Sequence, residues 1–337
     1  MKLKNVLFIG LGSIGQRHLR NLLKIQKRLN IYAFRKKKIC PLLDKNNKKI
    51  NGNIERKYKV INLTNFKNVK FDLVFITNPS SMHIDTLCNI KNLKNSYVFI
   101  EKPIDVNPEK IQKLKKFKNE NNLKIFVACN LRFNKVYDIF KKFLNKSPLG
   151  KINYVIVKSS LNIKDFHNYE NYEKSYTSKK ILGGGINFTS IHEIDLINNL
   201  FDKKLLINSF SKKISNLKVN INDFSSSLFK TTLKKDKFIT MLIMDHFQIN
   251  KERYINATCE KGEIKWDLVS NKIFINKKGS KKIVKFKIDN NEMYINQLKF
   301  FIKLVKSNRK IPDIYSEKNG IECLKIAIKI NSNQNKS

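Results

Sequence analysis

Near its start the chain reads Val6-Leu7-Phe8-Ile9-Gly10-Leu11-Gly12-Ser13-Ile14-Gly15. The four apolar residues are typical of a buried parallel strand. The three glycines that follow have the spacing G-x-G-x-x-G. Apolar residues then recur at helical spacing through residues 14–29. The segment therefore predicts a strand, a tight turn and a helix.

The glycine spacing has a steric meaning. Gly10 permits the tight turn after the strand, Gly12 lets the backbone approach a pyrophosphate, and Gly15 lets helix and strand pack closely. Ser13 and Ile14 would open the helix, where free amides and the positive end of the helix dipole favour phosphates. The pattern predicts a dinucleotide site, and the alternative interpretation is an ordinary glycine turn.

Working outward, the first 130 residues alternate between short apolar runs and amphipathic segments, which favours a doubly wound parallel sheet. The expected strands are 6–9, 31–34, 73–77, 97–100 and 125–128, and the expected helices are 14–29, 83–93 and 108–121.

The pattern changes after residue 130. Residues 162–180 are polar and aromatic without clear periodicity, and the following stretch contains several runs of alternating residues joined by polar turns, which favours an antiparallel or mixed sheet. The expected strands are 152–159, 225–232, 238–245, 253–259, 263–267, 272–275 and 281–288, and the expected helices are 136–144, 191–201, 293–307 and 318–330. We therefore expect an α/β chain with a doubly wound, Rossmann-type domain at 1–130 and an α+β domain at 131–337.

The chain has 337 residues, 41% of them hydrophobic, with 68 Lys+Arg against 27 Asp+Glu. This length suits about two domains. The formal charge of +41 invites a nucleic-acid interpretation. Lysine is nevertheless spread along the chain together with abundant Asn and Ile, as in a product of an AT-rich genome, and no nucleic-acid-binding motif is present. We therefore expect no nucleic-acid partner.

The five cysteines are far apart and form no C-x-x-C pair, which favours neither disulfides nor a zinc site and suggests a reducing cytoplasm. No apolar run approaches the roughly 20 residues of a spanning helix, so no membrane partner is expected. The spacing H-E-x-x-H is also absent, because position 196 is Leu196. We expect no metal.

The end of the second predicted strand bears on cofactor choice. An acidic residue there would bind the ribose of NAD, whereas this chain has Arg35 followed by Lys36-Lys37-Lys38. A guanidinium suits a 2′-phosphate, which tilts the prediction slightly from NAD to NADP. The alternative is an Arg35 that stacks on adenine or lies in solvent.

Two further segments carry candidate chemistry. Glu101-Lys102-Pro103 follows a strand and so lies at the carboxyl edge of the sheet, where Lys102 can bind a substrate hydroxyl and a cis Pro103 would fix its direction. The glycine-rich stretch 183–185 leads to His192, at the start of a helix, with Asp195 on the same helix face. A histidine there can accept a proton as a hydroxyl carbon loses hydride. A surface turn and a buried structural histidine are the respective alternatives.

Together these segments resemble the glucose–fructose oxidoreductase, inositol dehydrogenase and MocA (Gfo/Idh/MocA) family. The resemblance rests on five ordered motifs: the glycine loop with Gln16-Arg17-His18, Thr77-Asn78-Pro79 with His83, Glu101-Lys102-Pro103, Asn130-Leu131-Arg132-Phe133, and the glycine-rich segment ending at His192-Glu193-Ile194-Asp195. Residues 162–180, with Tyr172 and Lys174-Ser175-Tyr176, resemble a branch associated with bacterial surface-sugar biosynthesis.

The resemblance implies a second domain with an open, mostly antiparallel sheet that mediates homodimers or homotetramers. It also implies that Lys102 and His192 flank the substrate carbon at the nicotinamide. Where family members often carry Asp, three residues before the histidine, this chain has Thr189, which puts a Lys–Asp–His relay in doubt. Asp195 orients His192 instead, or caps a neighbour.

Further residues receive roles from the same resemblance. Arg132 is a candidate for binding a substrate carboxylate or phosphate, or is an ordinary structural arginine. Further cofactor contacts are expected from Asn78, Pro79, His83 and Glu101, and further substrate contacts from Tyr176 and Thr189. The prediction is an NAD(P)-dependent oxidoreductase for a sugar, cyclitol or nucleotide sugar. The alternative is a regulator or scaffold that binds the cofactor without chemistry.

Overall fold

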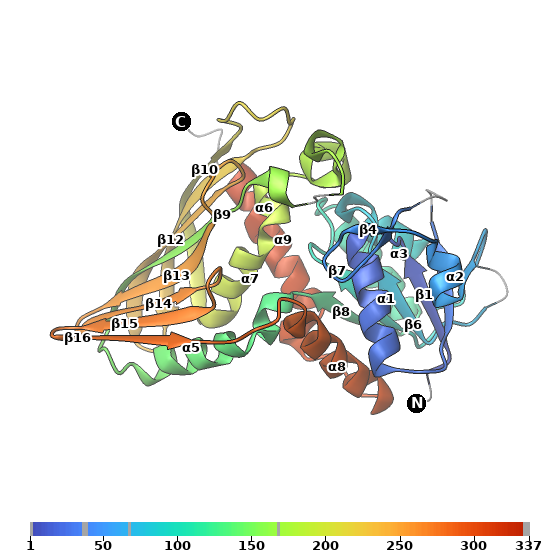
Figure 1. Ribbon diagram of the computed structural model, residues 1–337. Coiled ribbons are helices and arrows are strands. Elements are labelled where there is room, and N and C mark those ends of the chain that lie inside the picture. Colours follow the sequence, from blue (N-terminus) through green and yellow to red (C-terminus); the bar gives the residue numbers. More distant parts are fainter. Residues whose placement is uncertain (1–2, 36–39, 67–68, 167–168, 333–337) are drawn as a thin grey trace.

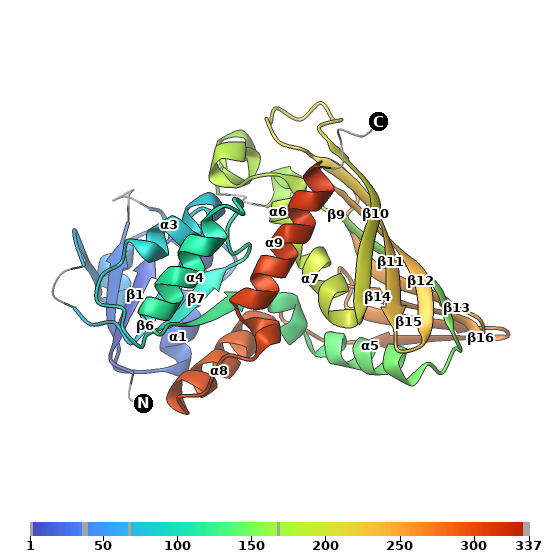
Figure 2. The same ribbon diagram turned by 180° about the vertical axis from the view of Figure 1, so that it is seen from behind.

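The computed structural model describes residues 3–35, 40–66, 69–166 and 169–332. Within these residues the chain forms two large sheets, each with helices packed against it, and one small two-stranded sheet. The helix α9 runs between the two large sheets (Figures 1 and 2). The N-terminal elements are β1 (Asn5–Ile9), α1 (Ser13–Ile25), β2 (Asn30–Phe34), β3 (Leu42–Leu43), β4 (Lys49–Ile50), α2 (Ile54–Tyr58), β5 (Val60–Asn62), β6 (Leu73–Ile76), α3 (His83–Cys88), β7 (Tyr97–Glu101), α4 (Lys110–Glu120) and β8 (Lys124–Ala128).

The first sheet is parallel, with the strand order β5-β2-β1-β6-β7-β8. Its central strands are fully buried because helices cover both faces, which explains their continuous apolar runs. The order reverses between β1 and β6, and such a switch point is where doubly wound folds bind ligands. The predicted Rossmann architecture is confirmed.

The second sheet has eight strands in the order β10-β11-β12-β9-β13-β14-β15-β16, of which β12 and β9 pair in parallel and the others antiparallel. This confirms the open, mostly antiparallel sheet. Its elements are α5 (Lys135–Lys146), β9 (Ile152–Ser160), α6 (Ile186–Thr189), α7 (Ile191–Leu200), β10 (Lys203–Lys212), β11 (Phe224–Leu233), β12 (Asp236–Asp245), β13 (Glu252–Cys259), β14 (Gly262–Asp267), β15 (Lys272–Lys277), β16 (Ser280–Lys285), α8 (Glu292–Lys306) and α9 (Glu317–Ser332).

The sequence analysis missed several of these elements, namely β3, β4, α2, β5 and β10, and it misplaced the end of α3. The edge strand β10 was not predicted, because Leu205, Leu206 and Ile207 are consecutive apolar residues that hide the alternation of a strand. The helix expected over residues 83–93 ends at Cys88, and Leu93 is buried in the loop that follows.

The helix α8 returns to the N-terminal domain. Its Phe301 ring lies 5.3 Å from the Phe99 ring and 5.1 Å from the Phe126 ring, and Leu298 and Val305 are buried in the same core. The predicted boundary at residue 130 separates the two sheets, whereas the C-terminal helices pack against the Rossmann core. The division into domains at that residue stays a prediction.

Candidate active site

The glycine loop has the three geometries that its spacing predicts. Gly10 has φ +87°, a left-handed conformation that favours glycine. A Cβ on Gly15 would lie 2.5 Å from the carbonyl oxygen of Gly10, so only glycine allows this packing. A Cβ on the exposed Gly12 would meet nothing within 4 Å. The space above Gly12 is therefore open, as the close approach of a pyrophosphate requires.

The helix α1 begins at Ser13 and offers its first amides to this space. No side chain caps it at Gly12, and its first turn has no acidic residue. The amides of Ser13 and Ile14 have no partner within the helix, and the helix dipole is positive at this end. These residues fit the pyrophosphate of a dinucleotide.

Arg35, at the end of β2, is already paired. Its guanidinium forms an ion pair with Glu55 of α2, and its Nη2 also donates to Asn62 Oδ1 at 2.9 Å. The sequence did not indicate Glu55 as the partner of Arg35. Glu55 lies 20 residues further along the chain, in a helix that only the fold places beside Arg35. A paired Arg35 indicates NADP less strongly than a free Arg35 would. Lys36, Lys37 and Lys38 lie outside the described residues.

The turn after β6 is held by its own polar side chains. Asn78 donates from Nδ2 to Thr86 Oγ1 at 3.0 Å, its Oδ1 has no partner among the described residues, and Pro79 leads into a short 3₁₀ turn. His83 is 1% exposed, and its two ring nitrogens each lie 2.8 Å from a backbone carbonyl, that of Pro103 and that of Asn78. A direct cofactor contact by His83 does not fit this geometry, and His83 instead joins two loops of the site.

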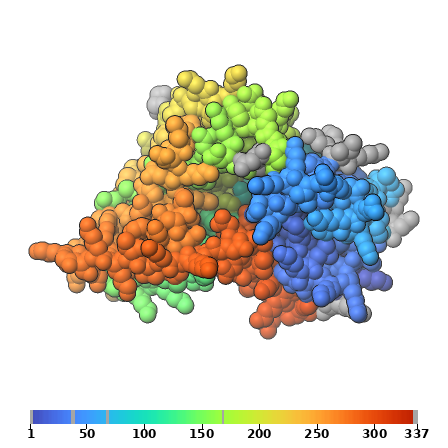
Figure 3. Space-filling view, viewed as in Figure 1, coloured from blue at the N-terminus to red at the C-terminus, as the bar shows by residue number. Residues whose placement is uncertain are grey.

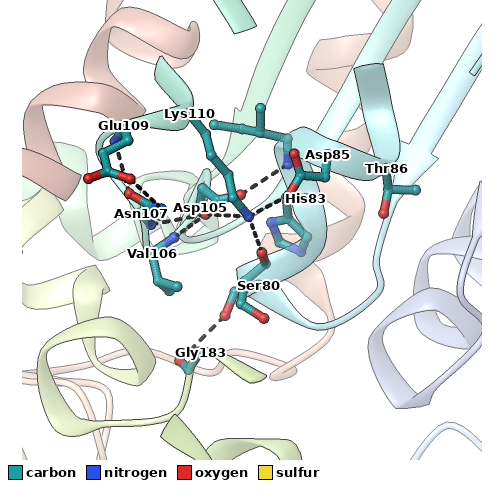
Figure 4. A network of polar contacts seen from close by, with 12 residues as sticks. Ser80, His83, Asp85, Thr86, Asp105, Val106, Asn107, Glu109, Lys110 and Gly183 are labelled. Carbon is teal, nitrogen blue, oxygen red and sulfur yellow. Dashed lines mark hydrogen bonds and ion pairs between the residues drawn. The ribbon is translucent and has the colours of Figure 1, made fainter. Parts of the chain in front are cut away.

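Figure 4 shows how further contacts fix the same loops. Lys110 Nζ forms an ion pair with Asp85 at 2.7 Å and donates to the carbonyl of Ser81 at 2.7 Å. Ser80 Oγ donates to the carbonyl of Gly183 at 3.4 Å, which ties the first domain to the glycine-rich segment of the second.

Glu101 orients the start of the lysine loop. Its Oε1 lies 2.6 Å from Nε2 of the fully buried His18, and its Oε2 accepts from the amide of Lys102 at 3.2 Å. The Lys102–Pro103 peptide bond is cis, as the sequence suggested. Both carboxylate oxygens of Glu101 are therefore bound within the protein, which does not favour the predicted cofactor contact. Nothing in the sequence indicated His18 as the partner of Glu101.

Lys102 reaches across to the second domain. Its Nζ donates to the backbone carbonyl of Thr189, the last residue of α6, at 2.9 Å. His192 lies in the first turn of α7, three residues further on. The imidazole of His192 has no hydrogen-bond partner among the described residues, and its Nδ1 is buried. The fold thus brings together the lysine and histidine that the sequence singled out.

Burial and neighbouring charges shift the pKa values of both groups. Burial lowers the pKa of Lys102, with a further lowering by Arg253, while Glu101 raises it. Burial also lowers the pKa of His192 well below 6.5, and the charges of Lys102, Arg253 and Arg132 act in the same direction. His192 is therefore neutral at pH 7 and is able to accept a proton.

The side chain of Thr189, which stands where family members often carry Asp, makes contacts that the sequence did not indicate. Its Oγ1 donates to the carbonyl of Gly185 at 2.9 Å and lies 2.7 Å from Nε2 of His246, a fully buried histidine. Burial lowers the pKa of His246 to about 4, so this histidine is neutral at pH 7. The side chain of Thr189 is held away from Lys102, which binds only the main-chain oxygen.

Asp195 does not orient His192. Its carboxylate forms a buried ion pair with Arg132, with Nε and Oδ2 2.9 Å apart, and accepts hydrogen bonds from Asn319 and Asn199. Arg132 is 4% exposed and donates to the carbonyl of Ile314. The expected catalytic role of Asp195 and the expected substrate contact of Arg132 do not fit this arrangement, because helical spacing cannot show which neighbour a carboxylate faces.

The segment around residues 169–183 lies over the glycine loop. Tyr169 shares a hydrogen bond with the side chain of Ser13. Burial of the Tyr176 hydroxyl and the nearby charge of Glu101 raise the pKa of Tyr176, so it stays protonated and can donate. Figure 3 shows the surface hollowed between the N-terminal domain and the strands of the second domain, below this segment.

Arg253 and Glu193 also reach the site, and the sequence analysis named neither as a site residue. Arg253 Nε donates to Glu193 Oε1 at 2.6 Å. Glu193 follows His192 directly, whereas Arg253 lies on β13, 60 residues away. In the sequence, the only indication of a role for Arg253 was an arginine at the start of a predicted strand.

Comparison with known proteins agrees with this geometry. The sequence model described as an oxidoreductase family with an NAD-binding Rossmann fold matches residues 4–129. None of the curated proteins matches the sequence significantly.

Solved structures of similar fold cover nearly the whole chain. A levoglucosan dehydrogenase in complex with NADH has a TM-score of 0.79 with 12% identity over 99% of this chain and 97% of that chain. The myo-inositol 2-dehydrogenase of Lactobacillus plantarum has a TM-score of 0.73 with 20% identity over 99% and 98%. The UDP-N-acetylglucosamine 3-dehydrogenase of Acidithiobacillus ferrooxidans has a TM-score of 0.72 with 13% identity over 98% and 97%. At these identities the similarity shows a shared two-domain fold. Residues 4–129 match the sequence model of the Gfo/Idh/MocA oxidoreductase family and so are similar to the NAD-binding domain of that family.

Proposed function

We propose that this protein is an NAD(P)-dependent dehydrogenase that acts on a CH–OH group of a sugar, cyclitol or nucleotide sugar. One observation carries the proposal: Lys102 Nζ donates to the carbonyl of Thr189 at 2.9 Å, which brings the lysine loop to the first turn of the helix that bears His192. The nicotinamide, when bound along the glycine loop, supplies the acceptor or donor of hydride.

Lys102 and His192 have separate roles, the first in binding the substrate oxygen and the second in proton transfer. An ammonium group has three donors, of which Thr189 uses one, so Lys102 can also hold the substrate oxygen. The imidazole of His192 is neutral and without a partner among the described residues, so it can take the hydroxyl proton during oxidation and return it during reduction. The similar folds of a myo-inositol 2-dehydrogenase and a levoglucosan dehydrogenase support a dehydrogenase activity.

The first test is the variant Lys102→Ala, measured after a thermal-shift screen with sugars and sugar nucleotides has identified a substrate. We expect loss of turnover by at least about a hundredfold, the usual size of an acid–base contribution, with the affinity for NADH retained. Unchanged turnover of Lys102→Ala would contradict the proposal.

The ion pair between Arg35 and Glu55 supports a second proposal, that the protein accepts both NAD(H) and NADP(H). Arg35 can attract a 2′-phosphate, while Glu55 offsets that charge and can accept from a free 2′-hydroxyl. Kinetic constants with the two cofactors test this directly.

The non-catalytic alternative rests on Thr189, whose hydroxyl carries no charge to relay. It would be supported if the protein bound NAD(P)H but reduced or oxidised no member of the panel. The absence of a fixed partner for His192 favours the enzyme, because a structural histidine would be hydrogen-bonded.

We also propose that the protein forms a homodimer or homotetramer through the second sheet. The face of this sheet away from the helices carries a row of half-buried apolar side chains, and no helix among the described residues covers it. These side chains are Ile156, Leu228, Ile239, Met241 and Ile243. Exposed apolar surface of this kind marks association sites. The predicted cytoplasmic location and the link to surface-sugar biosynthesis stay predictions, and no described helix has the length and apolar character to cross a membrane.

A further inference from the structure

Arg253 lies on the helix-facing side of the second sheet, at the edge of its core. In β13, the side chains of Ile255 and Ala257 are fully buried against the helices. Side chains alternate along a strand, so Arg253 shares their face. It pairs with Ser159 of β9, which is also fully buried. An arginine is therefore presented inward, where the rest of the strand presents apolar residues.

Glu193 fixes the direction of this arginine. The carboxylate is 1% exposed and binds Arg253 through Nε, at 2.6 Å. The terminal nitrogens of Arg253 have no protein partner among the described residues, and the side chain is 19% exposed. A guanidinium held at Nε keeps its outer nitrogens for a ligand, and these nitrogens match the geometry of carboxylate and phosphate oxygens.

Arg253 lies beside the reaction site, because Glu193, whose carboxylate binds it at 2.6 Å, follows His192 directly in the chain. The charge of Arg253 also lowers the pKa values of Lys102 and His192. The charges that act on His192 are three cations, those of Lys102, Arg253 and Arg132. Arg132 is neutralised by its buried pair with Asp195, whereas Lys102 and Arg253 each have donors without a partner among the described residues. The site thus presents two accessible cations beside the imidazole.

We propose that Arg253, held by Glu193, anchors an anionic group of the substrate, so that the substrate is a sugar derivative with a carboxylate or phosphate near the reacting carbon. This inference rests on the proposed function, because it names the substrate class of the same site. Arg253 is the specificity-determining residue, and Glu193 is a positioning residue. An anion here offsets the positive charge of Lys102 and of the oxidised cofactor.

The test compares binding of acidic and neutral sugars by calorimetry, with the protein saturated with NADH. The probes are the uronates, the 6-phosphates and the neutral hexoses of the D-gluco, D-galacto and D-manno series. We expect at least one acidic sugar to bind more tightly than its neutral counterpart, with the uronate and phosphate arms showing which anion is preferred. Arg253→Gln should reduce that affinity about tenfold to a hundredfold, as loss of hydrogen bonds to a charged group predicts.

The variants separate recognition from folding. Arg309→Gln removes one positive charge from an exposed side chain far along the chain and should leave the preference unchanged. Arg253→Lys keeps the charge on a single nitrogen, without the paired nitrogens of a guanidinium, and should retain part of the preference. This variant covers the case of a poorly folded Arg253→Gln. Equal binding of acidic and neutral sugars in all three series, or an unchanged preference in a folded Arg253→Gln or Arg253→Lys, would overturn the inference. Binding needs no hydride transfer. A finding that Lys102 or His192 plays no part in turnover would therefore be a separate result, which leaves this binding test intact.

Discussion

His192 is an imidazole placed among positive charges. Burial and the cations Lys102, Arg253 and Arg132 all disfavour its protonated form. A histidine with this environment remains a proton acceptor below neutral pH, where an ordinary histidine would already be charged. Its partner Lys102 is also shifted downward, mainly by burial. The two shifts set the pH range in which both groups have their working charge.

Substrate oxidation should therefore show two limbs in kcat/KM against pH. Activity falls as pH decreases through the pKa of His192, well below 6.5, because the protonated ring cannot accept a proton. Activity falls as pH rises through the pKa of Lys102, below 10.5, because the neutral amine loses a charged donor. Arg253→Gln should move the acid limb upward, since one of the lowering charges is gone. An acid limb at or above pH 6.5 in the unaltered protein would refute the assignment.

At the expected ribose site, Glu55 offsets the preference for NADP that Arg35 alone would produce. Glu55→Gln removes the carboxylate of this pair, so the ratio of kcat/KM for NADP over NAD should rise by about fivefold, corresponding to a partly exposed ion pair. The comparison variant is Glu120→Gln, an exposed carboxylate on α4, which should leave the ratio unchanged. A fall in the ratio for Glu55→Gln would show that Glu55 does not oppose the phosphate.

At the scale of elements, the strand–turn–helix unit could be predicted because its causes are local. Gly10, Gly12 and Gly15 are close in sequence, and each has the conformation or clearance that the spacing requires. His192 at a helix start was predicted for the same reason. The partners of site residues could not be predicted, because Glu55, His18 and Arg253 reach their partners only through the fold. Asp195 shows the converse error, since a shared helix face with His192 did not decide which group it binds.

Gly12 and Gly15 allow a matched test of the turn. Gly15→Ala places a Cβ 2.5 Å from the Gly10 carbonyl and should destabilise folding by about 1–3 kcal/mol, as overpacking does. Gly12→Ala has φ −68° and open space, so it should change the free energy of unfolding by less than about 0.5 kcal/mol. The same variant should weaken NADH binding, because its methyl group enters the space left for the pyrophosphate. Thermal unfolding and NADH titration distinguish the two, and tight NADH binding by Gly12→Ala would argue against a cofactor at this turn.

At the scale of the whole molecule, the site exists only where two domains meet. Lys102 comes from the first domain and His192 from the second, and α8 and α9 pack against the Rossmann core. The sequence predicted both sheets, but it could not show this return of the C-terminal helices, which depends on contacts such as Phe301 with Phe126. The outer face of the second sheet carries half-buried apolar side chains, and we propose that this face mediates self-association.

Met241→Glu tests that surface. Met241 lies on the outer face of β12, opposite Leu228, so a charge there should disfavour a sheet-to-sheet interface and shift the protein toward monomers in analytical ultracentrifugation. Lys116→Glu, on the exposed side of α4 in the first domain, is the control and should leave the assembly unchanged. A monomeric parent protein would contradict the proposed assembly outright.

The most direct measurement is a crystal structure of the protein with NADH. The account predicts the pyrophosphate at the amides of Ser13 and Ile14, above Gly12, with Lys102 Nζ and the His192 ring both facing the nicotinamide. A pyrophosphate bound elsewhere, or a nicotinamide that either of these two side chains faces away from, would contradict it.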